Sequence, residues 1–410
     1  MAFPLFRRRK TDDPNAKPRK KKPVWREWLD AALFAIVAAT IIRTFLVEAY
    51  TIPSESMEGT MLVNDYLFVS KLSYGPRLPM TPLAVPLVHN TMPFFGGKSY
   101  TDAVQWNYHR WPGFGHVERN DVVVFNFPEG DTVLKDENGN ISQDDYYRYV
   151  VQPGAREQYL AMGYEHRPAD KTDNYIKRCV GVPGDVIEVR QGNLFVNGQR
   201  SPDFVHLKNE YVFTSKTMVD EDSEKAWHIN PSKDYPATHP PGVRTMLLQN
   251  KYAAAAQRYF GVDNFRFYTE PLGQMKSSPA EWTFPRDTVN FKFNVDNFGP
   301  ITLPKKGVTV ALTPANISLY RRVISVYEHH KLEESAAGFV IDGKPATSYT
   351  FAYDYYWMMG DNRHASLDSR YFGFVPETHI VGKASFVWLS YGEGGIRWGR
   401  IFRGIHTLEK

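Results

Sequence analysis

The 410-residue chain has a single cysteine, Cys179, so its fold cannot rest on intramolecular disulfide bonds. This shortage does not place the protein in a reducing compartment, because an exported domain with a good core needs no bridge. Glycine and proline number only 29 and 28, which excludes collagen-like and low-complexity chains. The length allows on the order of two or three domains with a sizeable core.

Several functional signatures are also missing. None of the 12 histidines stands at metal-ligand spacing from a second histidine or an acid, so we expect no metal and no cofactor. No Gly-x-Ser-x-Gly motif occurs, which excludes the nucleophile elbow of the α/β-hydrolases. No internal repeat indicates a solenoid.

Positive charge is concentrated at the N-terminus. Residues 1–26 contain ten Lys and Arg against two acids, a net charge of +8. Because the whole chain carries +4, the residues after this tail carry −4. The net positive charge of the chain therefore comes from the tail and does not indicate a nucleic-acid-binding surface. We expect no nucleic-acid partner.

One long hydrophobic run follows the tail. Trp28–Val47 contains only two charged residues, Asp30 and Arg43, both near its ends. As a helix, 20 residues span about 30 Å, the thickness of the hydrocarbon core of a bilayer. We interpret 27–47 as a transmembrane signal-anchor helix. A buried helix of a soluble domain and a cleaved signal peptide are the alternatives, but the run is long and no small-x-small cleavage site follows it.

The orientation of this anchor follows from the charges beside it. Basic residues flank the run on its N-terminal side only, so the positive-inside rule places the 1–26 tail in the cytoplasm. Everything after about residue 48 then lies outside. Arg43, near the far end, is long enough to reach the headgroups.

The rest of the chain is predicted to be mostly β. Asp121–Phe127 reads as a strand, and 185–190 and 193–196 read as a hairpin joined by Gln191-Gly192, with Asn197-Gly198 as a second tight turn. We predict a catalytic antiparallel-β domain formed by 48–199 and 346–410. The remaining segment, 200–345, is predicted to be an inserted α+β accessory region.

Local features refine this division. Residues 77–118 are rich in Pro, Gly and aromatics and are predicted to be a long irregular connection. Within the inserted region we predict helices at 247–259 and 317–332. Aromatic residues outside the motifs are candidates for lipid contact, although core packing is the simpler explanation for most. They are Phe94, Phe95, Trp106, Trp111, Phe114 and the terminal segment 385–402.

Three segments carry residue types suited to chemistry: 51–62 (TIPSESMEGTML), 174–185 (NYIKRCVGVPGD) and 359–376 (MGDNRHASLDSRYFGFVP). Each has an ordinary structural explanation: a serine-containing loop, an edge-strand lysine and a hydrogen-bonded corner with an Asp368–Arg370 ion pair. Strand alternation places Lys177 on the face of Cys179. If Lys177 is buried, its pKa falls and it becomes a possible general base.

Together the segments resemble the signatures of the bacterial type I signal peptidases, the serine–lysine leader peptidases. PSESMEGTML at 53–62, YIKRCVGVPGD at 175–185 and GDNRHASLDSRYFG at 360–373 match the family's serine, lysine and C-terminal signatures, in the family's order. RNDVVVFNFP at 119–128 is similar to its strand-forming box. The four blocks cover about 50 residues.

The resemblance implies roles for individual residues. Ser56 is the nucleophile, Lys177 the general base, and Ser54 the side-chain donor that joins the Ser56 N–H in the oxyanion hole. Ser366 hydrogen-bonds the lysine and orients it. The structural support of the corner falls to Asp361, Asp368 and Arg370.

The resemblance also implies the substrate: exported preproteins with small residues at the first and third positions before the cut. Candidate walls of the shallow apolar pockets are Ile52, Pro53, Met57, Tyr175 and Ile176. Membrane lipid and the secretion translocon are the other implied partners. A bacterial inner-membrane location, single-pass with the catalytic domain outside, follows from the same resemblance.

Two residues of the signatures depart from the family pattern. Gly59 stands where the family usually has Pro, which suggests a looser turn after Ser56. His364-Ala365 replaces the usual acidic and amide pair in the C-terminal corner.

Other readings of the motifs stay open. The self-cleaving serine–lysine repressors share the β fold but lack an anchor, and a conjugation-type processing peptidase would use the same dyad. In a non-catalytic membrane-tethered β scaffold, Ser56→Ala would leave function untouched.

Overall fold

The computed structural model describes residues 23–93, 97–135, 141–145, 157, 161, 163–202, 204–214, 219–236, 244–392 and 394–409. Most of the basic tail lies outside these residues, as do the aromatic residues Phe94 and Phe95. The predictions made for those positions therefore stay predictions.

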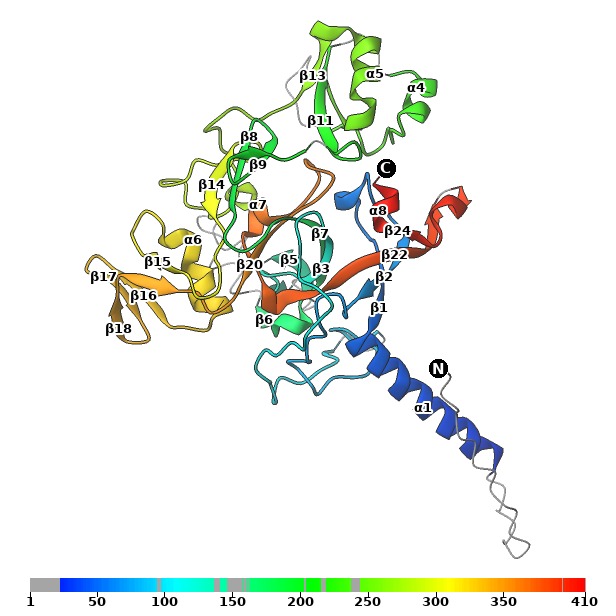
Figure 1. Ribbon diagram of the computed structural model, residues 1–410, viewed down its shortest axis with the longest axis vertical. Coiled ribbons are helices and arrows are strands. Elements are labelled where there is room, and N and C mark those ends of the chain that lie inside the picture. The colour runs from blue at the N-terminus through cyan, green and yellow to red at the C-terminus, as the bar shows by residue number, and fades with distance from the viewer. Residues whose placement is uncertain are drawn as a thin grey trace, which may run out of the picture.

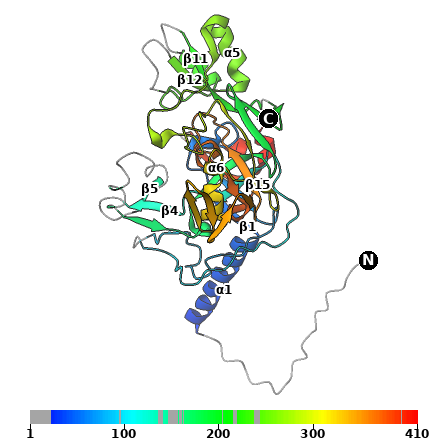
Figure 2. The same ribbon diagram turned by 90° about the vertical axis from the view of Figure 1, so that its left-hand side faces the viewer.

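Helix α1 (Val24–Phe45) projects from the body of the molecule (Figures 1 and 2). It has 22 residues, none of them buried, and is the one helix in the described part of the chain that is long and apolar enough to cross a membrane. It ends two residues before the predicted boundary at 47, because Val47–Thr51 forms strand β1. At this junction Arg43 donates to Glu48 (Nε–Oε1, 2.6 Å), and Phe45 stacks on Trp111.

The largest sheet has nine strands and curls into a half-barrel. Its main path runs β1-β2-β22-β3-β7-β20-β21, antiparallel throughout, while β23 and β24 pair with β22. The bounds are β2 Asp65–Ser70, β3 Val122–Asn126, β7 Asn174–Gly181, β20 Tyr355–Met359, β21 Val375–Pro376, β22 Ile380–Gly392, β23 Gly395–Ile396 and β24 Arg403–Gly404. The mostly β fold predicted from the sequence is confirmed.

Strand β3 is buried on both faces of the sheet. All five of its residues are buried, as expected for an uninterrupted apolar run at the centre of a covered sheet. Alternation sends Val122 and Val124 into one core cluster, with Met57 and Met61. Val123 and Phe125 enter a second cluster, with Cys179 and Phe372.

A second sheet contains the predicted hairpin. It has the order β10-β9-β8-β14, with β8 at Val186–Arg190, β9 at Asn193–Val196, β10 at Gln199–Arg200 and β14 at Phe298–Thr302. Both predicted turns have left-handed residues, at Gln191-Gly192 (φ 48° and 75°) and Asn197-Gly198 (φ 54° and 77°). Since β14 comes from within 200–345, this part of the chain shares a sheet with the segment before it.

A separate lobe lies at the top of Figure 1. Its three strands have the order β12-β11-β13 and pack against helix α5, with α4 beside them. The bounds are β11 Lys208–Phe213, α4 Glu221–Ala226, β12 Arg244–Gln249, α5 Asn250–Phe260 and β13 Phe265–Phe267. We call residues 204–214, 219–236 and 244–267 the β11–β13 lobe.

Both predicted helices differ from the structure at an end. The one predicted at 247–259 begins only at Asn250, because Leu247 and Leu248 pair with β11 as part of β12. The one predicted at 317–332 is helix α6 (Ile317–Arg322) continued by a π-helical turn (Val323–Tyr327). It ends early because Leu332 already belongs to strand β16 (Leu332–Ser335).

The remaining strands form small sheets at the periphery. They are β4 Thr132–Lys135, β5 Ile141–Asp145, β6 Tyr164–His166, β15 Thr309–Ala311, β17 Gly338–Ile341, β18 Lys344–Ala346 and β19 Ser348–Thr350. The described part of 77–118 contains only isolated bridges, which agrees with the predicted irregular connection. Its Trp106, Trp111 and Phe114 are exposed, so the expectation of core packing was wrong for these three.

Candidate functional site

Ser56 lies on a single 3₁₀ turn, Glu55–Met57, that follows strand β1. Met57 anchors the turn, since its side chain is fully buried in the core cluster beneath β3. The Glu58 N–H donates to the Glu55 carbonyl at 2.8 Å and closes the turn. Ser56 itself is buried, so the turn holds its hydroxyl against the sheet.

Lys177 reaches this hydroxyl from the middle of β7, where it pairs with Val123 of β3. Its side chain is buried, and its Nζ lies 2.7 Å from the Ser56 Oγ, across 121 residues of sequence. The Nζ also donates to the Ile176 carbonyl at 3.1 Å and lies 5.5 Å from the centroid of the Tyr175 ring. Lys177 is therefore an inward-pointing residue and not an edge-strand lysine in water.

Burial lowers the pKa of Lys177 to about 8, because the charged ammonium loses its hydration. The negative charges of Asp368 and Asp361 act in the opposite direction but do not cancel this effect. At mildly alkaline pH a large fraction of Lys177 is thus neutral, and a neutral amine can accept a proton from the neighbouring hydroxyl.

Ser54 lies on the open side of this pair. Ser54 is exposed, and its Oγ lies 3.2 Å from the Ser56 Oγ. A second hydroxyl group therefore lies beside that of Ser56. Ser54 has an extended backbone (φ −128°, ψ 161°) just before the turn.

Ser366 differs from its expected role. Among the residues that the structure describes, its buried hydroxyl has no hydrogen-bond partner, so the predicted bond to Lys177 is not formed. Ser366 nonetheless packs close to the Ser56 turn through Gly360. A Cβ on Gly360 would lie 2.2 Å from the Ser366 Oγ and 2.5 Å from the Ser56 carbonyl oxygen, so only glycine fits between them. The Ser366 hydroxyl is near Ser56, but the Lys177 Nζ donates to the Ser56 Oγ and the Ile176 carbonyl instead.

Two buried ion pairs stabilise the C-terminal corner near Ser56 and Lys177. Asp368 binds Arg370 through both carboxylate oxygens, at 2.9 and 2.8 Å, as the sequence suggested. Asp361 instead binds Arg178, at 2.8 and 2.7 Å, and accepts a hydrogen bond from the Thr60 hydroxyl at 2.6 Å. Burial acts to raise the pKa of both acids, but the adjacent guanidinium outweighs it and lowers each pKa.

Sequence reasoning missed two members of this corner. Arg178 directly follows Lys177, so strand alternation turns its side chain to the opposite face of the sheet. This alternation was the signal that Arg178 pairs with a different acid. Asn362 binds two carbonyl groups of the Ser56 turn. Its N–H donates to the Ser56 carbonyl at 3.1 Å, and its side-chain amide donates to the Glu55 carbonyl at 3.3 Å. Nothing in its local sequence distinguishes this asparagine from a turn residue.

The five predicted pocket residues fall into two groups. Ile52 and Met57 are buried in the core, so they do not offer surface to a ligand. Pro53 is exposed, and Tyr175 and Ile176 are half-buried beside Lys177. Tyr175 is held by stacking on Phe127, with ring centroids 4.4 Å apart.

Comparison with known families places these features in context. A family model described as signal peptidase, peptidase S26, matches residues 25–262 and 324–389. The matched residues include all three motif segments and most of the chain. This chain belongs to the signal peptidase family, peptidase S26.

Individual relatives agree with this family over most of their length. The chain is 22% identical to the signal peptidase I of Buchnera aphidicola (subspecies Schizaphis graminum), over 87% of this chain and 73% of the relative. It is 24% identical to that of Haemophilus influenzae, over 91% and 72%. For Pseudomonas aeruginosa the identity is 22%, over 90% and 75%. Membership of the family makes this chain a peptidase.

Proposed function

We propose that this peptidase is a membrane-anchored serine endopeptidase that removes N-terminal signal peptides from exported preproteins. Ser56 is the nucleophile and neutral Lys177 its general base. The observation that carries the proposal is the 2.7 Å contact between the Ser56 Oγ and the Lys177 Nζ in a buried environment. A serine hydroxyl attacks a peptide carbonyl only when a nearby base takes its proton.

The proposed reaction has two halves. Lys177 accepts the Ser56 proton while the Oγ bonds to the scissile carbonyl carbon, and the oxyanion accepts hydrogen bonds from the Ser56 N–H and the Ser54 hydroxyl. Protonated Lys177 then donates to the leaving amine, the N-terminus of the mature protein. In the second half, Lys177 deprotonates a water that hydrolyses the acyl-enzyme and releases the signal peptide.

Substrate selection is proposed to occur along the strand edges beside the dyad. Pro53, Tyr175 and Ile176 retain exposed surface there, and their apolar side chains suit small residues at the first and third positions before the cut. The exposed Ser54 lies on the same side, so a peptide bound there would have its carbonyl between Ser54 and Ser56.

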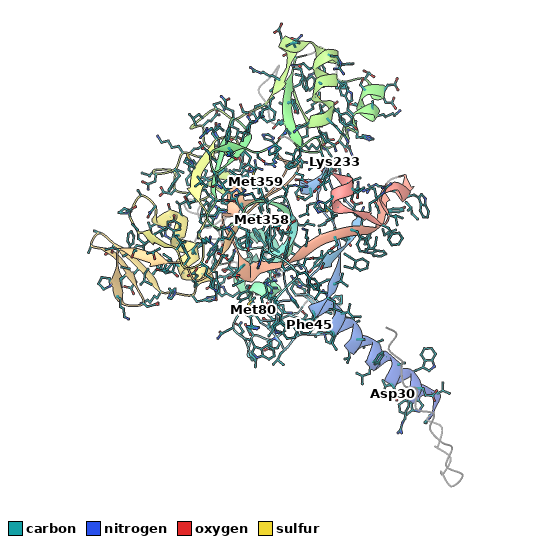
Figure 3. All side chains as sticks on the ribbon, in the orientation of Figure 1. Asp30, Phe45, Met80, Lys233, Met358 and Met359 are labelled. Carbon is teal, nitrogen blue, oxygen red and sulfur yellow. The ribbon has the colours of Figure 1, made fainter. Side chains whose placement is uncertain are left out.

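The anchor is proposed to place this site at the membrane surface. Helix α1 ends at Phe45, and Ser56 follows after one short strand, so the nucleophile lies close to the end of the helix. In Figure 3, Phe45 lies where α1 meets the body and Asp30 lies far along the helix. With the N-terminus in the cytoplasm, the catalytic domain faces the outside, where signal peptides emerge.

A direct test uses the purified full-length protein in detergent with a preprotein bearing an Ala-x-Ala site. We expect cleavage after the second Ala by the wild type and by a matched control, Ser335→Ala, on an exposed strand. Ser56→Ala should reduce the rate to background without loss of thermal stability. Undiminished cleavage by Ser56→Ala would reject Ser56 as the nucleophile, and no cleavage by folded wild type would reject this substrate class.

A further inference from the structure

The β11–β13 lobe contacts the Ser56 turn and the C-terminal corner directly. Lys208 N–H donates to the Asp361 carbonyl at 2.9 Å, and Arg363 N–H donates to the Lys208 carbonyl at 2.8 Å. These two bonds form a parallel bridge between Lys208 and Asn362, the residue that binds the backbone of the Ser56 turn. Lys208, the first residue of β11, therefore pairs with the backbone segment that supports the Ser56 turn.

The Lys208 side chain makes a second link. Its Nζ is buried and lies 2.8 Å from Glu58 and 2.5 Å from Asp234, so it joins an acid of the Ser56 turn to an acid of the lobe. Lys233, next to Asp234, forms an ion pair with Glu55. Figure 3 shows Lys233 at the base of the lobe, facing the body. Two lysines thus bind the two glutamates that flank Ser56.

The two departures from the family pattern lie at the same junction. Gly59 has φ 110°, which proline cannot adopt, and a Cβ there would lie 2.0 Å from the His206 carbonyl oxygen of the lobe. The glycine therefore allows the lobe to approach the turn closely.

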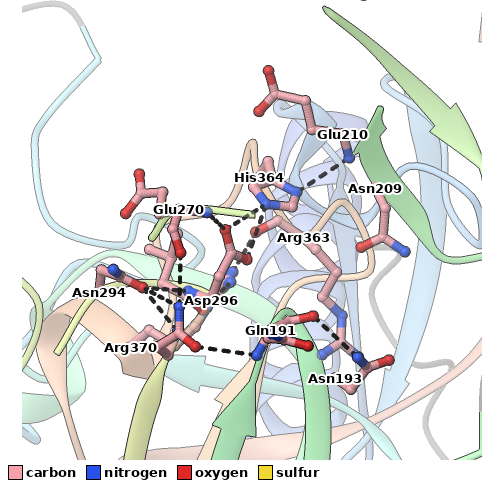
Figure 4. Close-up of polar contacts among 12 residues, drawn as sticks. Gln191, Asn193, Asn209, Glu210, Glu270, Asn294, Asp296, Arg363, His364 and Arg370 are labelled. Carbon is pink, nitrogen blue, oxygen red and sulfur yellow. Dashed lines mark hydrogen bonds and ion pairs between the residues drawn. The ribbon is translucent and has the colours of Figure 1, made fainter. Parts of the chain in front are cut away.

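His364 is the second departure. Its Nδ1 accepts from the Glu210 N–H of β11 at 3.2 Å, and its Nε2 lies 3.1 Å from Asp296 (Figure 4). Burial acts to raise the pKa of Asp296, but His364, the Glu270 N–H and the charge of Arg370 together outweigh it and lower that pKa. At both positions the unusual residue contacts or accommodates the segment 206–210.

We propose that the β11–β13 lobe is a positioning element of the active site, and that Glu58 and Lys208 are the positioning residues through which it orients Ser56 toward Lys177. The proposal rests on the proposed function for its catalytic readout only. Because the lobe binds Glu55 and Glu58, on either side of Ser56 in the sequence, it can restrict the rotation of the turn that would lengthen the contact between the Ser56 Oγ and the Lys177 Nζ.

Glu58→Gln is the variant of choice. It removes the charge that Lys208 binds on the turn, while Lys208 keeps Asp234 and no buried charge is left alone. The acids that act to raise the pKa of Lys177 are Asp368 and Asp361, and Glu58→Gln leaves both in place. Lys225→Gln, in an exposed ion pair of the same lobe, is the matched control.

The measurements are kcat and KM on the Ala-x-Ala preprotein, thermal stability, and amide hydrogen exchange of peptides covering 54–62. We expect Glu58→Gln to lower kcat roughly 10- to 100-fold with KM nearly unchanged, since small misplacements of reacting groups have effects of this size. Exchange in 54–62 should quicken while the rest of the chain and the melting temperature match Lys225→Gln. Glu58→Asp should restore part of kcat.

Gly59→Pro provides the second variant, because it installs the family's usual residue. We expect it to lower kcat at least as much as Glu58→Gln, since it cannot adopt the φ that lets the lobe approach.

Each remaining outcome decides between the hypotheses. Wild-type kcat and wild-type exchange in Glu58→Gln would overturn the positioning role, and so would a loss of activity accompanied by faster exchange throughout the molecule. If the wild type fails to cleave, the proposed function fails, and the exchange of 54–62 still decides whether the lobe orders the turn.

Discussion

Two buried lysines contact the Ser56 turn, Lys177 at Ser56 and Lys208 at Glu58, and they have opposite pKa shifts. Lys177 binds the Ser56 hydroxyl and a carbonyl, and its pKa is lowered to about 8 by burial. At Lys208 burial also acts to lower the pKa, but Glu58 and Asp234 outweigh it and raise the pKa. Both side chains are buried, but only Lys208 has carboxylates in direct contact, and these carboxylates let it keep its proton.

This contrast separates a lysine suited to chemistry from one suited to structure. An unpaired buried amine is expensive to protonate, which makes it a base at the cost of stability. A buried lysine with two carboxylates is always charged and joins the segments that carry them. Removing the lysine should therefore change the free energy of unfolding in opposite directions at the two positions.

The largest expected effect is the loss of activity in Lys177→Met. Without a base near the Ser56 hydroxyl, kcat should fall by more than about 10³-fold, the scale seen when a member of a catalytic set is removed. Lys331→Met, at an exposed lysine, should cleave the Ala-x-Ala preprotein at the wild-type rate. Lys177→Arg should be as inactive as Lys177→Met, because a guanidinium cannot be deprotonated at working pH. Substantial activity in either variant would rule out the dyad.

Lys208→Met should be the most destabilising of the lysine substitutions. It leaves Asp234 buried without its cation, and breaking one side of a buried pair costs about 3–5 kcal/mol of the free energy of unfolding. Denaturant unfolding of Lys208→Met beside Lys225→Met measures this. Equal stability of the two variants would show that the Lys208 pairs contribute no more than an exposed pair.

Lys177→Met should have the opposite effect on stability. Below pH 8 the lysine is charged in both states, and burial disfavours the charge only in the folded chain. Removing it should raise the free energy of unfolding by on the order of 3 kcal/mol. The gain should shrink as pH rises from about 8 towards the ordinary pKa of 10.5, where the lysine is neutral in the folded state but protonated in the unfolded one. A variant less stable than wild type at pH 7 would contradict this cost.

The smallest expected effect is the pH dependence of the wild-type rate. kcat/KM should rise about tenfold per pH unit below the pKa of Lys177 and level off above about pH 8. Lys208 should add no step in this range, because its proton is held by two acids. Rates measured between pH 6 and 9.5 test both statements, and a flat profile would indicate a different base.

The residues of the proposed dyad could be predicted because their motifs are local, whereas several contacts could not. Ser56 and Lys177 were recognised from segments of about ten residues, and the structure brings them to 2.7 Å. Ser366 was assigned a hydrogen bond that the structure does not form, since the direction of a hydroxyl depends on packing around Gly360. The partner of Asp361 was missed because Arg178 lies 183 residues away in the sequence.

The sequence by itself determined the elements whose signals are local. The long apolar run became α1, the short apolar segment Asp121–Phe127 became a strand with two buried faces, and the Asn-Gly and Gln-Gly pairs became tight turns. Only the tertiary structure decided the charge state of each lysine. Ser56 is 121 residues from Lys177, and Glu58 is 150 residues from Lys208. A pKa depends on the groups within a few ångströms of the amine, and those neighbours exist only once the sheet and the β11–β13 lobe have assembled around the Ser56 turn.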